Sequence, residues 1–67
     1  MQSSQALAAN LQQIRLRRGW TIDDASAATG FDASVLEGIE RGVTFLSRTR
    51  TNDLAERLGV SVEDLTG

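Results

Sequence analysis

The chain has 67 residues, 40% of them apolar, and contains neither cysteine nor histidine. A chain of this length forms one small domain, predicted to span residues 1–67. Without cysteine and histidine it has no disulfides, lacks the usual zinc ligands and lacks the most common general base, which argues against an enzyme, a metal site or a cofactor. Seven arginines against nine acidic residues leave a net charge of −2, whereas duplex-binding domains are usually basic.

The sequence also argues against contact with a membrane. No apolar run approaches the ~20 residues needed to cross a bilayer. The first residues lack the basic and apolar regions of a signal peptide. The protein is therefore predicted to be cytoplasmic.

Helices joined by short turns are expected throughout, because the chain has no proline and no long run of alternating polarity. The first helix is predicted from about Ser4 to Arg18. Leu7, Leu11 and Ile14 repeat there at helical spacing, and Gly19 follows.

The second and third helices are predicted from their end signals. "TIDD" forms a capping box in which Thr21 opens the second helix, and this helix ends by Gly30. Asp32 is expected to cap the third helix, "ASVLEGIER", and Gly42 to end it. The inner face of the third helix is expected to carry Val35, Leu36 and Ile39.

A fourth helix is predicted around Thr51 to Leu58, ending at Gly59. A short fifth helix follows, since "SVED" at Ser61 to Asp64 repeats the capping-box pattern. The expected apolar contacts of these two helices are Leu54, Ala55, Leu58, Val60, Val62 and Leu65.

The second and third helices are joined by "TGFD", a short turn with glycine where a helix-turn-helix needs a tight backbone. "IRLRRGWT", "IERG" and "LAERLGVSVEDL" stand around it in matching order and spacing. Together these segments resemble the Cro and phage-repressor family, the xenobiotic-response-element type of helix-turn-helix. The resemblance implies an all-α, compact five-helix, lambda-repressor-like domain. It also implies a dimer that binds operator DNA with the third helix, about residues 33–41, in the major groove.

The resemblance places phosphate contacts on both sides of the third helix. Thr21 and the first amides of the second helix match the family's phosphate clamp, because a helix N-terminus attracts anions. Thr21 is equally expected to act as a plain N-cap, and the two roles are compatible. Ile22 stands where the family commonly has a glutamine that contacts phosphate, so one donor is missing. Arg41, Arg48 and Arg50 are expected to reach flanking phosphates, or else to form a solvated charged face.

The base-facing positions of the third helix are, by the resemblance, Ala33, Ser34 and Gly38, with Glu37 at the edge. Ser34 offers one hydroxyl and Ala33 one methyl group, so direct readout of bases is expected to be poor. Gly38 destabilises a helix by roughly 0.8 to 1 kcal/mol relative to alanine. Three explanations stay open for it: close approach of DNA, close approach of a protein surface, or drift at a tolerant exposed site.

Two further sets of residues are expected to act in structure and assembly. Arg15 and Glu40 stand where the resemblance predicts an ion pair between the first and third helices. Val60, Val62 and Leu65, around the fifth helix, match the surface that commonly pairs subunits in the family and are expected to form a homodimer interface.

Phe45 and Leu46 lie in an irregular segment before the fourth helix. The favoured prediction is that both fold back and supply core side chains. The alternative is that they form an exposed apolar patch for a partner.

These patterns favour a non-enzymatic transcriptional regulator that binds double-stranded DNA as a homodimer. Its specificity would come from Ser34, Ala33, dimer spacing and DNA shape. The rival hypothesis is a protein-interaction module, an antirepressor or adaptor, that contacts a partner regulator through Phe45, Leu46 and the third helix. A third hypothesis is the N-terminal part of a longer regulator. Surface charge over the third helix separates the first two, since positive charge suits phosphate and neutral or negative charge suits a protein.

Overall fold

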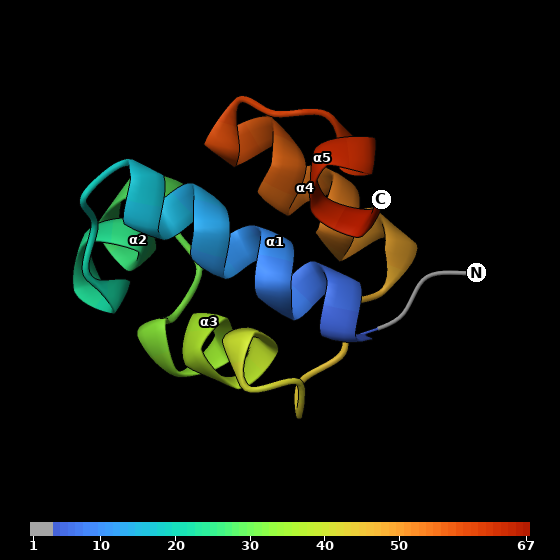
Figure 1. Ribbon diagram of the computed structural model, residues 1–67, viewed down its shortest axis with the longest axis horizontal. Helices are drawn as coiled ribbons and strands as arrows, with labels where there is room; N and C mark the ends of the chain where they lie inside the picture. Colours follow the sequence, from blue (N-terminus) through green and yellow to red (C-terminus); the bar gives the residue numbers. More distant parts are fainter. Residues whose placement is uncertain (1–3) are drawn as a thin grey trace.

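The computed structural model describes residues 4–67, which form five α-helices and no strand (Figure 1). The helices are α1 (Ser4–Arg17), α2 (Ile22–Thr29), α3 (Ala33–Glu40), α4 (Arg48–Leu58) and α5 (Val62–Thr66). α1 crosses the molecule between α3 on one side and α4 with α5 on the other, and α2 contacts both α3 and α4. The predicted all-α, five-helix fold is confirmed. The predicted domain also includes residues 1–3, which lie outside the described residues.

The core receives one fully buried leucine from each of four helices, namely Leu11, Leu36, Leu54 and Leu65. α2 contributes only small side chains, Ala25 and Thr29. Phe31, in the turn after α2, is 5% exposed and belongs to the same cluster. Burial of such a side chain stabilises a fold by about 1.5 to 3 kcal/mol, so the turn supplies apolar contact area that α2 lacks.

The two predicted capping boxes are both present. The hydroxyl of Thr21 accepts a hydrogen bond from the Asp24 N–H at 3.1 Å, and the Asp24 carboxylate accepts one from the Thr21 N–H at 2.9 Å. Ser61 and Asp64 repeat the arrangement, with both distances 3.1 Å. Each such cap stabilises a helix by about 0.5 to 2 kcal/mol, so the starts of α2 and α5 are fixed locally.

Two helix starts differ from the prediction. Asp32 occupies the N-cap position of α3 but makes no side-chain capping hydrogen bond. α4 begins at Arg48, three residues earlier than predicted, because the Ser47 hydroxyl accepts a hydrogen bond from the Arg50 N–H at 3.2 Å. This cap lacks the acidic partner three residues later that marks a capping box, so its sequence signal is weak.

Two apolar residues, Phe45 and Leu65, require correction of the sequence-based expectations. Leu46 packs against the core, as predicted, but Phe45 is 74% exposed, so the prediction that it folds back is wrong. Leu65 is fully buried within its own chain and has no surface to offer a second copy, so its assignment to a dimer interface is also wrong. Val60 and Val62 are partly buried against the same core.

No helix within the described residues combines the length and the apolar character that a membrane span requires.

Candidate nucleic-acid interface

The turn between α2 and α3 is fixed by side chains of α2. Gly30 ends α2 with φ +76°, a left-handed conformation that glycine adopts without a steric penalty. Thr29 Oγ1 then accepts a hydrogen bond from the Phe31 N–H at 3.2 Å, and Ser26 Oγ donates one to the Phe31 carbonyl at 2.6 Å. Both backbone polar groups of the buried Phe31 are therefore satisfied, which holds α3 at a defined angle to α2.

α4 supports the same turn from behind. Arg57 Nη1 donates to the Thr29 carbonyl at 3.2 Å, and its Nε donates to Asp53 Oδ1 at 3.0 Å. The Arg50 guanidinium carbon lies 4.9 Å from the centroid of the Phe31 ring, in cation–π geometry. Sequence reasoning missed the role of Arg57, because its partner is a backbone carbonyl 28 residues away.

Arg15 and Glu40 join α1 to the end of α3. Arg15 Nε and Nη2 donate to the two Glu40 oxygens at 2.7 and 2.9 Å, and Nη1 donates to the Trp20 carbonyl at 2.9 Å. The two side chains are only 14% and 8% exposed. The hydrogen bonds to Glu40 raise the pKa of Arg15 against the opposing effect of burial. The pair fixes the far end of α3 while the turn fixes its start.

A shallow groove lies between the start of α2 and the outer face of α3. It is lined by Thr21, Ile22, Asp23, Ala33, Ser34 and Glu37. Five of these are positions predicted to face DNA, and the fold brings them together from two helices. Asp23 is the addition, and the sequence analysis did not place it among the DNA contacts. The groove contains two carboxylates, Asp23 and Glu37, and no basic residue among its described lining.

Gly38 does not face this groove. It is buried, and a Cβ added to it would overlap Oγ1 of Thr44 and lie 3.0 Å from the Thr44 Cβ. Its carbonyl accepts hydrogen bonds from the N–H groups of Val43 and Thr44 at 3.0 and 3.1 Å. The assignment of Gly38 as a base-facing residue is therefore wrong. None of the three earlier explanations applies, because the close approach is made by the chain itself.

Comparison with known proteins places this geometry in a family. The chain matches the model of a family described as a helix-turn-helix domain over residues 6–66. The chain belongs to this helix-turn-helix family. The resemblance to the Cro and phage-repressor type that the sequence predicted is confirmed. No curated protein sequence matches the chain.

Solved helix-turn-helix structures superpose closely on the chain. The restriction-modification controller protein C.Esp1396I, described as a tetramer in complex with its natural 35 base-pair operator, is 26% identical with a TM-score of 0.77, covering 87% of this chain and 76% of its own. The clp gene regulator ClgR from Corynebacterium glutamicum is 29% identical with a TM-score of 0.77, covering 92% and 66%. The controller protein C.AhdI from Aeromonas hydrophila, 24% identical with a TM-score of 0.80 and covering 92% and 94%, shares the fold.

Charge in this helix-turn-helix protein is divided along the chain. Residues 23–40, which contain most of α2 and all of α3, carry five acidic residues and no basic one. Residues 41–52 carry three arginines and no acid. Arg41 is 71% exposed in its side chain and lies 3.7 Å from Glu37, whereas Arg48 is exposed and has no ion pair among the described residues. The basic residues predicted to contact phosphate therefore follow α3 and lie outside its groove.

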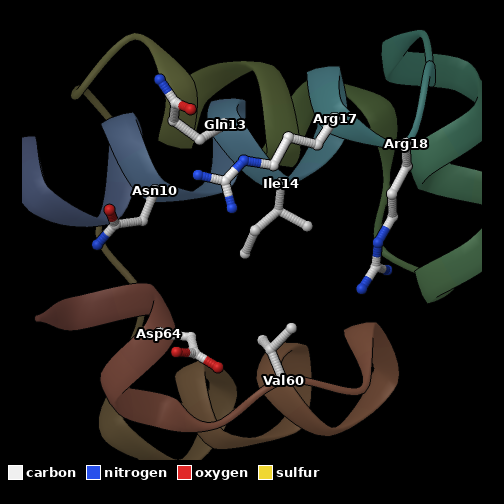
Figure 2. A pocket seen from close by; sticks show the side chains of 7 residues that line it. All are labelled: Asn10, Gln13, Ile14, Arg17, Arg18, Val60 and Asp64. Atoms are coloured by element: carbon white, nitrogen blue, oxygen red, sulfur yellow. The ribbon is translucent and has the colours of Figure 1, made fainter.

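A second groove separates α1 from the turn between α4 and α5. Figure 2 shows side chains of α1 facing Val60 and Asp64 across it. Its lining from α1 is Asn10, Gln13, Ile14 and Arg17, and Arg18 follows directly after the helix. α3 and α5 contact α1 on different sides, so this groove is remote from the groove of the helix-turn-helix (Figure 1). Val60 lies here, and its role in pairing subunits stays a prediction.

Proposed function

We propose that the chain is a non-enzymatic, cytoplasmic transcriptional regulator, one domain over residues 1–67, that binds operator DNA as a homodimer with α3 in the major groove. The observation that carries this proposal is membership of the helix-turn-helix family. The groove gathers Thr21, Ala33 and Ser34, but its two carboxylates favour the alternative function described below. The operator-bound relative C.Esp1396I supports the proposal. Val60 and Val62 are the proposed subunit contacts.

Phosphate contacts are assigned to Arg41, Arg48 and Arg50. Two of these lie in the first turn of α4, where the helix dipole disfavours a cation by about 0.3 to 1 kcal/mol. Contact with the Phe31 ring offsets this cost for Arg50, whereas Arg48 has no ion pair among the described residues. An external anion at this end of α4 would interact favourably with both arginines and with the dipole, which supports contact with a phosphate.

Base readout is assigned to Ser34, Ala33 and Glu37. None of them carries a fork of two donors, so discrimination by any one base contact is expected to be small. A carboxylate accepts a hydrogen bond from the cytosine amino group, which gives Glu37 a defined base preference. Most of the specificity is assigned to half-site spacing and DNA shape.

The test is selection of purified protein against a random duplex library at about 0.1 M salt, where the Debye length is ~10 Å and non-specific attraction is weakened. We expect enrichment of a two-fold symmetric site. A circular dichroism spectrum taken on the same sample checks that the protein is folded. A folded protein that enriches no sequence would contradict operator binding.

The alternative function is a protein-interaction module, an antirepressor or adaptor. The observation in its favour is the acidic groove beside α3, which suits a basic segment of a partner regulator, together with the exposed Phe45. In that case the same selection yields no site. A peptide array of basic segments then replaces the duplex library as the search.

A further inference from the structure

The segment between α3 and α4 presents two large apolar side chains to solvent. Val43 and Phe45 are 70% and 74% exposed, and they flank Thr44. Figure 1 shows this segment projecting beyond the end of α3. We name residues 43–45 the apolar tip.

The apolar tip is built against α3. The Gly38 carbonyl accepts hydrogen bonds from the N–H groups of Val43 and Thr44, and Thr44 occupies the space that a Cβ at Gly38 would need. Thr44 is partly buried, while its neighbours on both sides are exposed. Because Thr44 packs on α3, its exposed neighbours Val43 and Phe45 are turned toward solvent. This packing of Thr44 on α3 requires glycine at position 38, although glycine weakens the helix.

The size of the apolar tip argues against a stable protein partner. A stable protein interface buries about 800 Å² on each side, far more than two side chains supply. The charge around the tip points to a polyanion instead. Arg41 and Arg48 precede and follow it in the chain, both are exposed, and no acidic residue occurs from 41 to 52, although Arg41 lies 3.7 Å from Glu37 of α3. Apolar side chains contact nucleic acids at thymine methyl groups or at opened base steps.

We propose that the apolar tip contacts the DNA duplex beside α3, with Phe45 against an apolar base edge and Arg41 and Arg48 on the phosphates to either side. The inference rests on the proposed function, since it requires that the chain binds a duplex. It adds Val43 and Phe45 to the binding surface. It also gives Gly38 a role in positioning them.

The first test compares Phe45→Ala with Leu16→Ala by fluorescence anisotropy. Leu16 is 59% exposed on α1 and serves as the matched control for loss of an exposed apolar side chain. The duplexes are the selected operator and a random-sequence duplex of equal length. Phe45→Ala is expected to weaken operator binding about five- to tenfold with an unchanged salt dependence, because no phosphate contact is lost. Leu16→Ala is expected to bind as the unmodified chain does.

Substituted duplexes distinguish the two apolar targets. Replacing thymine by deoxyuridine removes the methyl group, and 2-aminopurine reports unstacking by increased fluorescence. If the target is a methyl group, deoxyuridine at one position and Phe45→Ala each weaken binding, and their combination adds little. If the target is an opened step, binding increases 2-aminopurine fluorescence, and Phe45→Ala abolishes the increase. Either result supports the proposal.

Three results would overturn the proposal. If Phe45→Ala, still folded by its melting curve, binds the operator as tightly as the unmodified chain, the tip does not contact DNA while the proposed function stands. If sedimentation shows DNA-free self-association that Phe45→Ala removes, the tip pairs two copies. If the unmodified chain binds neither duplex, the proposed function and this inference fail together.

Discussion

Residues 23–40 and residues 41–52 of this protein carry opposite charges in adjacent parts of the chain. The first segment holds the helix-turn-helix with five acids, and the second holds three arginines and the apolar tip. In the proposed function, the first segment contacts the base edges of the duplex and the second contacts its phosphates. The difference teaches that an acidic domain of net charge −2 can still gather exposed arginines in one short segment.

The largest effect is expected at Glu40, the acid of the first segment whose role is structural. Glu40→Ala leaves Arg15 without its carboxylate partner in a site where both side chains are largely buried. Loss of one member of such a pair destabilises a fold by about 3 kcal/mol. For a domain of this size that lowers Tm by roughly 12 °C or more, measured by circular dichroism. Glu56→Ala, an exposed change on α4, is the control, and an equal Tm for both variants would contradict the role of the pair.

The next effect is expected in the basic segment. Arg48→Ala and Arg50→Ala should each weaken duplex binding about tenfold at low salt and reduce the slope of log K against log salt by roughly 1, for every sequence tested. Arg17→Ala removes the same charge beside the second groove and should change binding much less. If both variants bind the duplex as tightly as the unmodified chain, the assignment of phosphate contacts to Arg48 and Arg50 is wrong.

A smaller effect is expected in the acidic groove. Glu37→Gln removes a negative charge from the groove and the partner of Arg41, so repulsion of the duplex falls and binding to a non-operator duplex should strengthen about two- to fivefold, as measured by anisotropy at 0.1 M salt. Glu63→Gln, an equal change on α5, should leave it unaltered. If Glu37→Gln has no effect on duplex binding, the groove faces something other than DNA, as in the alternative function.

The smallest effect is expected where the two segments meet. Gly38→Ala alone should destabilise the protein, because its new Cβ overlaps Thr44. Combined with Thr44→Gly, the alanine should recover its higher helix propensity. A double-mutant cycle from urea unfolding should therefore show a coupling energy of about 1 kcal/mol between the two sites. Zero coupling would mean that the glycine serves another purpose.

Much of this fold is local and was predictable from the sequence. Thr21 with Asp24, and Ser61 with Asp64, signal their helix starts within four residues, and Gly30 and Gly42 mark their helix ends. Ser47 was missed because its cap has no acidic partner. Such signals depend only on neighbouring residues, which is why five helices were predicted in the right order.

Features that depend on contacts between distant parts of the chain were harder to predict. The buried Phe31 stands in a turn without periodicity, and α5 is too short for spacing to separate Leu65, which faces the core, from Val62. The dependence of Gly38 on Thr44 leaves no pattern in the sequence. In the candidate site, residue types predicted a poor base-reading face. The structure adds Asp23 to it, and the assignment of DNA contacts stays a prediction.

The exposed apolar tip also has a consequence for handling the protein in solution. A net charge of −2 at pH 7 and an isoelectric point of about 4.8 provide little electrostatic repulsion between molecules. Exposed apolar side chains such as Phe45 and Val43 then favour precipitation, most strongly as the buffer is acidified toward the isoelectric point. If a duplex covers the tip, adding DNA should increase the solubility of the protein, and Phe45→Ala should increase it without DNA.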